Sequence, residues 1–183
     1  MSSAVKITKI EAGKPQLETA IRMFFKEEDP VAIHTLAAAA HDVLWGIAKK
    51  RGTMSLLKNN PLIAKQHQKE MHGIVSEAKN FFKHGIRDPN AGVEFNPETT
   101  AYFLIDAIEI YRQVIGQPSP VMISMMAWFQ LKNAHIFSKN PLNRAQLALL
   151  DKLGLNPDHR QAFSQLEREL EEIASQVNSG AHV

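Results

Sequence analysis

Apolar residues recur at intervals of three and four along almost the whole of this 183-residue chain, in segments separated by prolines and glycines. That interval places them on one face of an α-helix, whereas a half-buried strand would alternate apolar and polar residues. The sequence shows no such alternation, no internal repeat and no low-complexity tract. It therefore predicts an all-α fold, a helical bundle of about seven helices without a sheet.

Two helix starts are especially clear, at Asp29-Pro30 and at Asn96-Pro97-Glu98-Thr99. In both, a side chain able to cap free backbone amides precedes a proline that suits the first helical position. We expect helices over residues 15–25, 30–51, 64–84, 97–116, 121–137, 145–153 and 158–176. The segment 121–137 is apolar nearly all round, which predicts central burial or a place in a subunit interface.

The length fits one domain with a substantial core and is too short for two typical domains. We expect a single helical domain over residues 1–183, with flexible tails at 1–12 and 177–183. Residues 143–176 are expected to form an accessory helical pair.

Composition narrows the classes of protein that the chain can belong to. Apolar residues make up 44% and charged residues 22%, as in ordinary globular proteins. Cysteine is absent, which removes disulfides, thiol catalysis and cysteine-ligated zinc. The N-terminus lacks a signal-peptide pattern, and we see no apolar run near the roughly 20 residues that span a bilayer. We expect a cytoplasmic protein that does not enter a membrane.

Positive charge is concentrated in one part of the chain. Residues 49–87 carry nine Lys or Arg against two acids, a net charge of +7, although the whole chain carries only +2. A basic region in an otherwise acidic protein is typical of a surface that meets an anion such as nucleic acid. The alternative is that these side chains form solvated helix surfaces that keep the protein soluble.

The densest set of reactive side chains lies where a helix is expected to end, in residues 77–89. Gly85 suits a helix C-cap and Pro89 bars continuation. The last turns carry Lys79, Asn80, Lys83 and His84. Cations there stabilise the negative end of the helix dipole whatever else they do. A cation, an amide and a titratable imidazole at one place can also bind and process a phosphate-containing ligand.

The run Lys79-Asn80-Phe81-Phe82-Lys83-His84-Gly85 resembles the signature of the HEPN superfamily of helical bundles. That signature is an arginine, often followed by asparagine, and a histidine after four to six further residues near a helix end. Here the gap is four residues. In helix order the resemblance covers residues 15–137, and it implies a HEPN-like bundle.

The resemblance implies a function as well as a fold. In active HEPN ribonucleases, the motifs of two subunits form a metal-independent site that cleaves RNA. By analogy, His84 would be the general acid or base, Lys79 would stabilise the phosphate and Asn80 would position it. Lys79 replaces the family's arginine and offers a point charge instead of a planar fork. Other HEPN proteins bind RNA or partners without catalysis.

We therefore expect an RNA- or nucleotide-binding homodimer, able to act as an endoribonuclease, with no cofactor. One alternative is a non-enzymatic interaction protein in which residues 77–89 only end a helix and dock a loop onto a protein partner. Another is a small-ligand or metal-binding bundle that uses His34, His41 and His72 with a glutamate. The spacing of these histidines does not match a chelating pair on one helix turn, and hydrogen bonding at the edge of the core is their commoner use.

Overall fold

The computed structural model describes residues 4–60, 76–84 and 90–180. Over these ranges the protein consists of helices, turns and loops, without a strand, so the all-α prediction is confirmed. The chain forms two compact units. The first takes in the residues up to Ala20 and Asp29–Gln117, and the second takes in Ile21–Glu28 and the residues from Pro118 onward.

The first helix, α1 (Lys9–Phe25), begins well before the predicted position and has Pro15 inside it. A capping box explains this start. The amide of Thr8 donates to Glu11 Oε2 at 2.8 Å, and the amide of Glu11 donates to Thr8 Oγ1 at 3.2 Å. The sequence pattern Thr-x-x-Glu is typical of this motif, whereas the apolar spacing alone predicts a start at Pro15.

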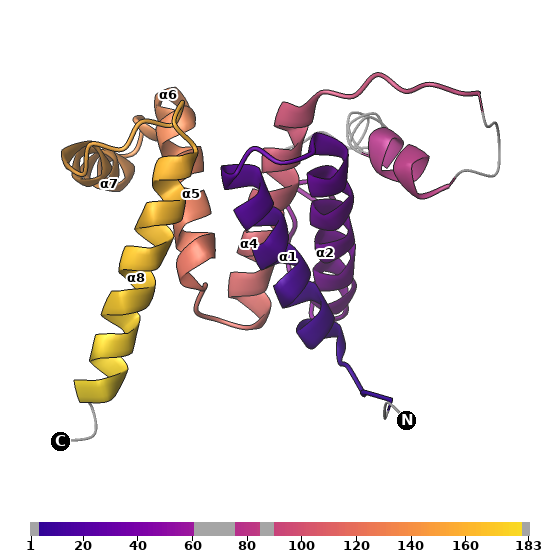
Figure 1. The fold of residues 1–183 in the computed structure, drawn as a ribbon, viewed down its shortest axis with the longest axis horizontal. Helices are drawn as coiled ribbons and strands as arrows, with labels where there is room; N and C mark the ends of the chain where they lie inside the picture. Colours follow the sequence, from indigo (N-terminus) through magenta and orange to yellow (C-terminus); the bar gives the residue numbers. More distant parts are fainter. Residues whose placement is uncertain (1–3, 61–75, 85–89, 181–183) are drawn as a thin grey trace. The chain divides into compact units, whose positions relative to one another are not determined.

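The core of the first unit lies between α2 (Pro30–Lys50) and α4 (Thr100–Val114), which pack against each other (Figure 1). Both predicted start signals are confirmed. Asp29 accepts from the amide of Ala32 at 2.8 Å, and Asn96 caps the 3-10 helix η1 (Pro97–Thr99) that leads into α4. The buried apolar side chains here include Ile33, Ala37, Leu44, Phe103, Leu104, Ala107 and Ile108.

Residues 76–83 form a helix in the first unit, and His84 follows directly after it. This is the end of the helix that we expected over residues 64–84. Its earlier part, the predicted cap at Gly85 and the stop at Pro89 lie outside the described residues.

The second unit contains four helices after Pro118: α5 (Pro120–Lys132), α6 (Ala134–Phe137), α7 (Pro141–Lys152) and α8 (Gln161–Gly180). Helix α5 packs against α8, and six of its residues are buried, as its apolar sequence indicated. The expected helix over 121–137 breaks at Asn133, whose side chain donates to the carbonyl of Phe129 at 2.9 Å. Helix α7 begins at Pro141, earlier than the predicted start at residue 145. The side chain of Asn140 caps this start by accepting from the amide of Leu142.

The C-terminal part of α1 belongs to the second unit, and two phenylalanines from it enter the core there. Phe25 stacks on Phe163 with ring centroids 5.7 Å apart, and Phe24 meets Trp128 edge to face at 4.8 Å. Arg22 adds an ion pair with Glu167 at 2.7 Å. Helix α8 continues to Gly180, so residues 177–180, which we expected in a flexible tail, are helical.

Candidate anion-binding site

Helix 76–83 contacts α2 through an ion pair between Lys79 and Asp42, which the sequence analysis did not predict. The Lys79 ammonium donates to both carboxylate oxygens of Asp42, each at 3.0 Å. Lys83 lies one turn further along the same helix, with its Nζ 3.5 Å from Asp42 Oδ2. Lys79 is only 8% exposed, whereas the Lys83 side chain is 31% exposed. One carboxylate therefore holds two ammonium groups at different depths.

A third ammonium group, that of Lys58, is close enough to feel the same charges. Burial lowers the pKa of Lys58, and the positive charge of Lys79 lowers it further, while Asp42 and Asp106 act in the opposite direction. We call Lys58, Lys79 and Lys83, gathered around Asp42, the lysine cluster. It brings together three of the nine basic residues of the segment 49–87.

Asp42 is ionised in this setting. Burial alone would raise its pKa, but interactions with His41 and Lys79, together with the charge of Lys83, hold the pKa of this carboxyl well below its usual range. His41 Nδ1 lies 3.8 Å from Asp42 Oδ1, which is an electrostatic contact too long for a hydrogen bond.

A buried network continues from His41 into the core. Asp106 is 1% exposed, and its Oδ2 accepts from His41 Nε2 at 2.8 Å and from Ser55 Oγ at 2.5 Å. Its two oxygens also accept from the backbone amides of Leu56 and Leu57. These bonds fix the loop after α2 onto α4, and this loop carries the next residue along, Lys58.

The protonation of the network follows from its contacts. Burial would lower the pKa of His41, but its hydrogen bond to Asp106 and its electrostatic contact with Asp42 outweigh burial and raise this pKa. Burial would likewise raise the pKa of Asp106, but His41 and Ser55 outweigh it and lower that pKa. His41 thus lies between two carboxylates, which favour its charged form, and it joins the lysine cluster to the buried Asp106.

The three residues named by the HEPN resemblance have different surroundings. Lys79 is buried against Asp42, whereas Asn80 and His84 are exposed. Neither Asn80 nor His84 contacts Lys79 through a hydrogen bond or an ion pair among those that the described ranges contain. Within one chain, the structure therefore joins Lys79 to Asp42 and leaves Asn80 and His84 open to solvent.

His34 is a core residue in this structure. It is 1% exposed, its Nδ1 lies 2.9 Å from Thr100 Oγ1, and its ring meets Phe82, Phe95 and Phe103 edge to face. Burial, with smaller contributions from the charges of Lys79 and Lys83, lowers the pKa of His34 to about 4, so the ring is neutral near pH 7. Its Nε2 has no hydrogen-bond partner.

The metal-binding alternative used His34, His41 and His72. His34 is bonded to Thr100 and His41 to Asp106, and His72 lies outside the described residues. Among the side chains that the structure describes, no group of three or more His, Cys, Asp or Glu is placed to hold a metal ion.

Sequence reasoning missed Asp42 and Asp106, although both carried a signal. Asp42 is the only acid in α2 and directly follows His41. Asp106 is the only charged residue in the apolar run from Phe103 to Ile108. A single acid on a buried helix face requires a hydrogen-bond donor or a cation, because burying an unpaired charge destabilises the fold by on the order of several kcal/mol.

Helix α2 is also the one described helix that is long and apolar enough to cross a membrane by length and composition. The core helix of a soluble protein passes the same test, and eight residues of α2 are buried within the first unit.

No protein-family model, no curated protein and no solved structure matches this chain. Its function is therefore inferred from its own residues.

Proposed function

We propose that this chain is a helical module that binds a phosphate-bearing ligand, RNA or a nucleotide, at the lysine cluster. The observation that carries the proposal is the sharing of the Asp42 carboxylate by two ammonium groups, with Lys58 in electrostatic range. Lys79 and Lys83 carry one positive charge more than Asp42 balances, and they repel each other in a partly buried place, where charges interact more strongly than in open water. An anion reduces that repulsion, and a phosphate offers several oxygens to the ammonium donors.

The two lysines of helix 76–83 have different parts in this proposal. Asp42 holds Lys79 in place, and the more exposed Lys83 offers its ammonium to the phosphate. Asn80 and His84, exposed on the same short segment, are available to the rest of the ligand. Lys79 then supports binding mainly through the long-range attraction of its positive charge for the phosphate, and not through direct contact.

The test is fluorescence anisotropy with labelled single-stranded RNA of mixed sequence, and with a labelled mononucleotide, over a range of salt concentrations. We expect Lys83→Ala to weaken RNA binding and to reduce the slope of log K against log salt by about 0.7, the share of one phosphate contact. Lys139→Ala, which removes an exposed lysine of the second unit, is the matched control and leaves both unchanged. Equal binding by the Lys83 and Lys139 variants would contradict the proposal, and so would a wild-type chain that binds neither probe.

We propose further that the bound RNA is cleaved without a metal, as the HEPN resemblance implies. His84 is exposed one residue after the helix that carries Lys83, so it can reach the 2′-hydroxyl of a phosphate-bound nucleotide. His84→Ala is expected to abolish cleavage in the presence of EDTA while RNA binding is kept. His135→Ala, at an exposed histidine of the second unit, is the control. Cleavage that survives His84→Ala, or that EDTA stops, would count against this step.

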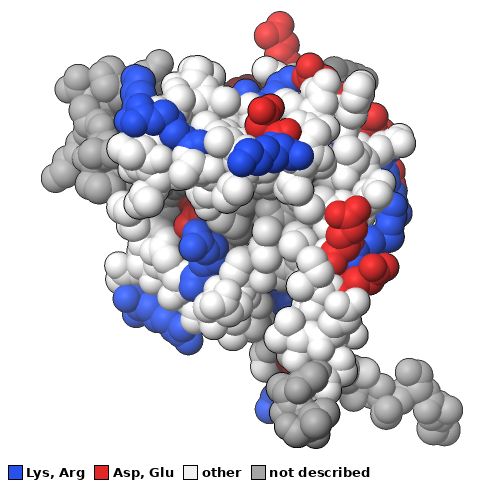
Figure 2. Space-filling view, turned by 90° about the vertical axis from the view of Figure 1, so that its left-hand side faces the viewer, with Lys and Arg blue, Asp and Glu red and all other residues white. Residues whose placement is uncertain are grey.

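A second candidate function is helix-mediated self-association, which the expected homodimer requires. Leu142 and Leu149 of α7, and Leu153 directly after it, are 78%, 62% and 62% exposed. On the face that Figure 2 shows, acidic and basic side chains are interspersed with uncharged residues. Exposed leucines can pack against the same leucines of a second copy across a two-fold axis, and we propose a second copy of this chain as their partner.

Sedimentation at micromolar concentration tests this proposal. Leu149→Lys is expected to shift a dimeric wild type toward the monomer, because it places a charge in the apolar contact. Ser138→Lys adds the same charge at an exposed polar site and is the control. A monomeric wild type, or a dimer that Leu149→Lys leaves intact, would overturn it.

A further inference from the structure

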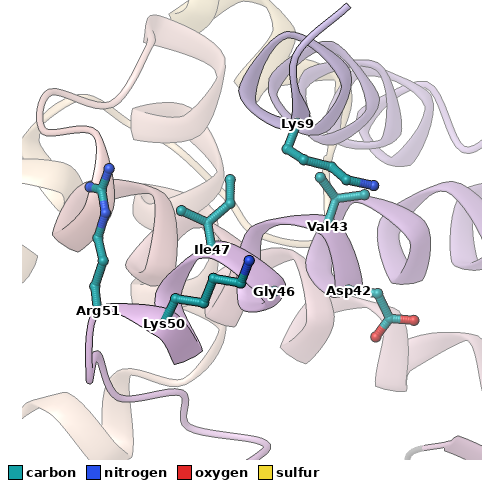
Figure 3. A pocket seen from close by; sticks show the side chains of 7 residues that line it. All are labelled: Lys9, Asp42, Val43, Gly46, Ile47, Lys50 and Arg51. Carbon is teal, nitrogen blue, oxygen red and sulfur yellow. The ribbon is translucent and has the colours of Figure 1, made fainter.

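A groove in the first unit lies along α2, on the side of the first turn of α1 (Figure 3). Its volume is about 440 Å³, within the range of small-molecule sites. Val43 and Ile47, both half-buried, line it with apolar surface. Lys9, Lys50 and Arg51 line it with basic side chains, and Asp42 is its one acidic residue.

Gly46 lies among these residues, and no contact with the described part of the chain requires a glycine there. A glycine inside a helix costs about 1 kcal/mol relative to alanine. Gly13 of α1 shows what normally justifies that cost, because a Cβ there would lie 3.1 Å from a methyl group of Val43. A Cβ at Gly46 would meet nothing within 4 Å. A side chain at this position would therefore extend into the open space of the groove.

The basic residues of the groove are also only partly explained by helix stability. Lys50 is in the last turn of α2, where a cation favours the dipole. Lys9 is the first residue of α1, where the dipole disfavours a cation. Arg51 is held in place by a hydrogen bond from its Nη1 to the carbonyl of Val114 at 2.7 Å. The guanidinium keeps further N–H donors for a ligand.

The charged residues that line the groove are mainly basic. Three cations line it, and the single carboxylate, Asp42, is already bound by Lys79 and Lys83 on the other side. Neighbouring positions on α2 thus present apolar side chains, an open space at Gly46 and basic groups to the same small volume.

We propose that this groove binds a small organic anion with an apolar body, a carboxylate, sulfonate or phosphate ester whose flat or hydrocarbon part lies on Val43 and Ile47. The anionic group is received by Lys9, Lys50 and Arg51. The site is separate from the phosphate-binding role of Lys83, since the two share only Asp42. It has the composition of a ligand site, an apolar lining with a few polar groups that fix orientation.

The experiment is an NMR titration of the full-length protein with 2-naphthoate, and with 2-naphthol as an uncharged probe of similar shape. We expect 2-naphthoate to shift the amide signals of Val43, Gly46 and Ile47, with the neutral probe binding at least several-fold more weakly. Lys9→Ala and Lys50→Ala should each weaken 2-naphthoate about two- to fivefold, as expected for exposed charge contacts.

Gly46→Leu is the decisive variant, because it fills the groove from a position where the structure has room. It should abolish the 2-naphthoate shifts while the protein stays folded and RNA binding by the lysine cluster is kept. Lys83→Ala should weaken RNA binding and keep the 2-naphthoate shifts. The two variants therefore separate this site from the proposed RNA function. Shifts that map outside the groove, equal binding of 2-naphthol, or unchanged binding by Gly46→Leu would each overturn the proposal.

Discussion

At the scale of single residues, the two buried histidines of α2 have pKa values shifted in opposite directions because their neighbours differ. His41 faces two carboxylates, Asp106 and Asp42, which raise its pKa. His34 faces a threonine and three phenylalanine rings, and burial with nearby lysine charges lowers its pKa to about 4. Seven residues apart on one helix, the same side chain has a raised pKa in one place and a lowered pKa in the other.

The first prediction follows from His34. Its pKa falls from 6.5 in the unfolded chain to about 4 in the fold, so the unfolded chain binds the extra proton between these values. Stability should therefore fall as the pH drops from 6.5 toward 4, by about 2 kcal/mol at pH 5. His41 acts differently: its raised pKa gives stability that is fully present below 6.5 and is lost as the pH rises through the folded value.

Urea unfolding between pH 4 and pH 7 checks this. His34→Gln has no proton to gain, so its stability should vary less with pH across this range than that of the wild type. His135→Gln, at an exposed site, is the control and should follow the wild type. An unchanged pH dependence in His34→Gln would show that the ring takes up a proton in the fold as readily as in the unfolded chain, and would contradict the lowered pKa.

At the scale of elements, one buried carboxylate joins α2, the loop after it and α4. Asp106 accepts four hydrogen bonds, from His41, Ser55, Leu56 and Leu57. The loop is therefore positioned by a single side chain of α4. Since Lys58 follows these residues, the lysine cluster depends on the same anchor.

We predict that Asp106→Asn destabilises the protein by about 3–5 kcal/mol, the usual cost of removing one partner of a buried ion pair. The amide replaces a charged acceptor and brings N–H donors toward other donors. Hydrogen exchange should then speed up at the amides of Leu56 and Leu57 before it does so in the middle of α4. Asp151→Asn, at an exposed carboxylate of α7, is the matched control. Unchanged protection of the two loop amides would contradict the anchoring role.

Helices were predictable from the sequence to the extent that local signals decided them. The apolar spacing predicted nearly the whole of α2 and α4. The capping residues Asp29 and Asn96 predicted where α2 and the 3-10 turn before α4 begin. The break at Asn133 was not predictable, because a uniformly apolar stretch carries no signal for where a helix ends. Contacts between distant residues, such as Lys79 with Asp42, depend on tertiary packing and leave no spacing pattern in the sequence.

At the scale of the whole molecule, α1 takes part in both compact units. The chain from Ile21 to Glu28 belongs to the second unit, although it precedes most of the first in sequence. Phe24 and Phe25 are 2% and 0% exposed there, against Trp128 and Phe163. The second unit therefore lacks part of its core unless α1 is present, and a fragment that begins at Pro118 should not fold alone.

Phe25→Ala tests this dependence in the intact chain. Removing a fully buried phenylalanine costs about 3–5 kcal/mol, and the loss should fall first on the unit that contains Phe163. The chain has two tryptophans, Trp45 in the first unit and Trp128 in the second, so 5-fluorotryptophan gives one ¹⁹F signal for each unit. In urea, the Trp128 signal of Phe25→Ala should change at lower denaturant than the Trp45 signal. Phe81→Ala, at a 38% exposed ring of the first unit, should leave the Trp128 transition where it is in the wild type. If both signals of Phe25→Ala move together, the two units unfold as one cooperative body, because α1 then transmits the loss to both.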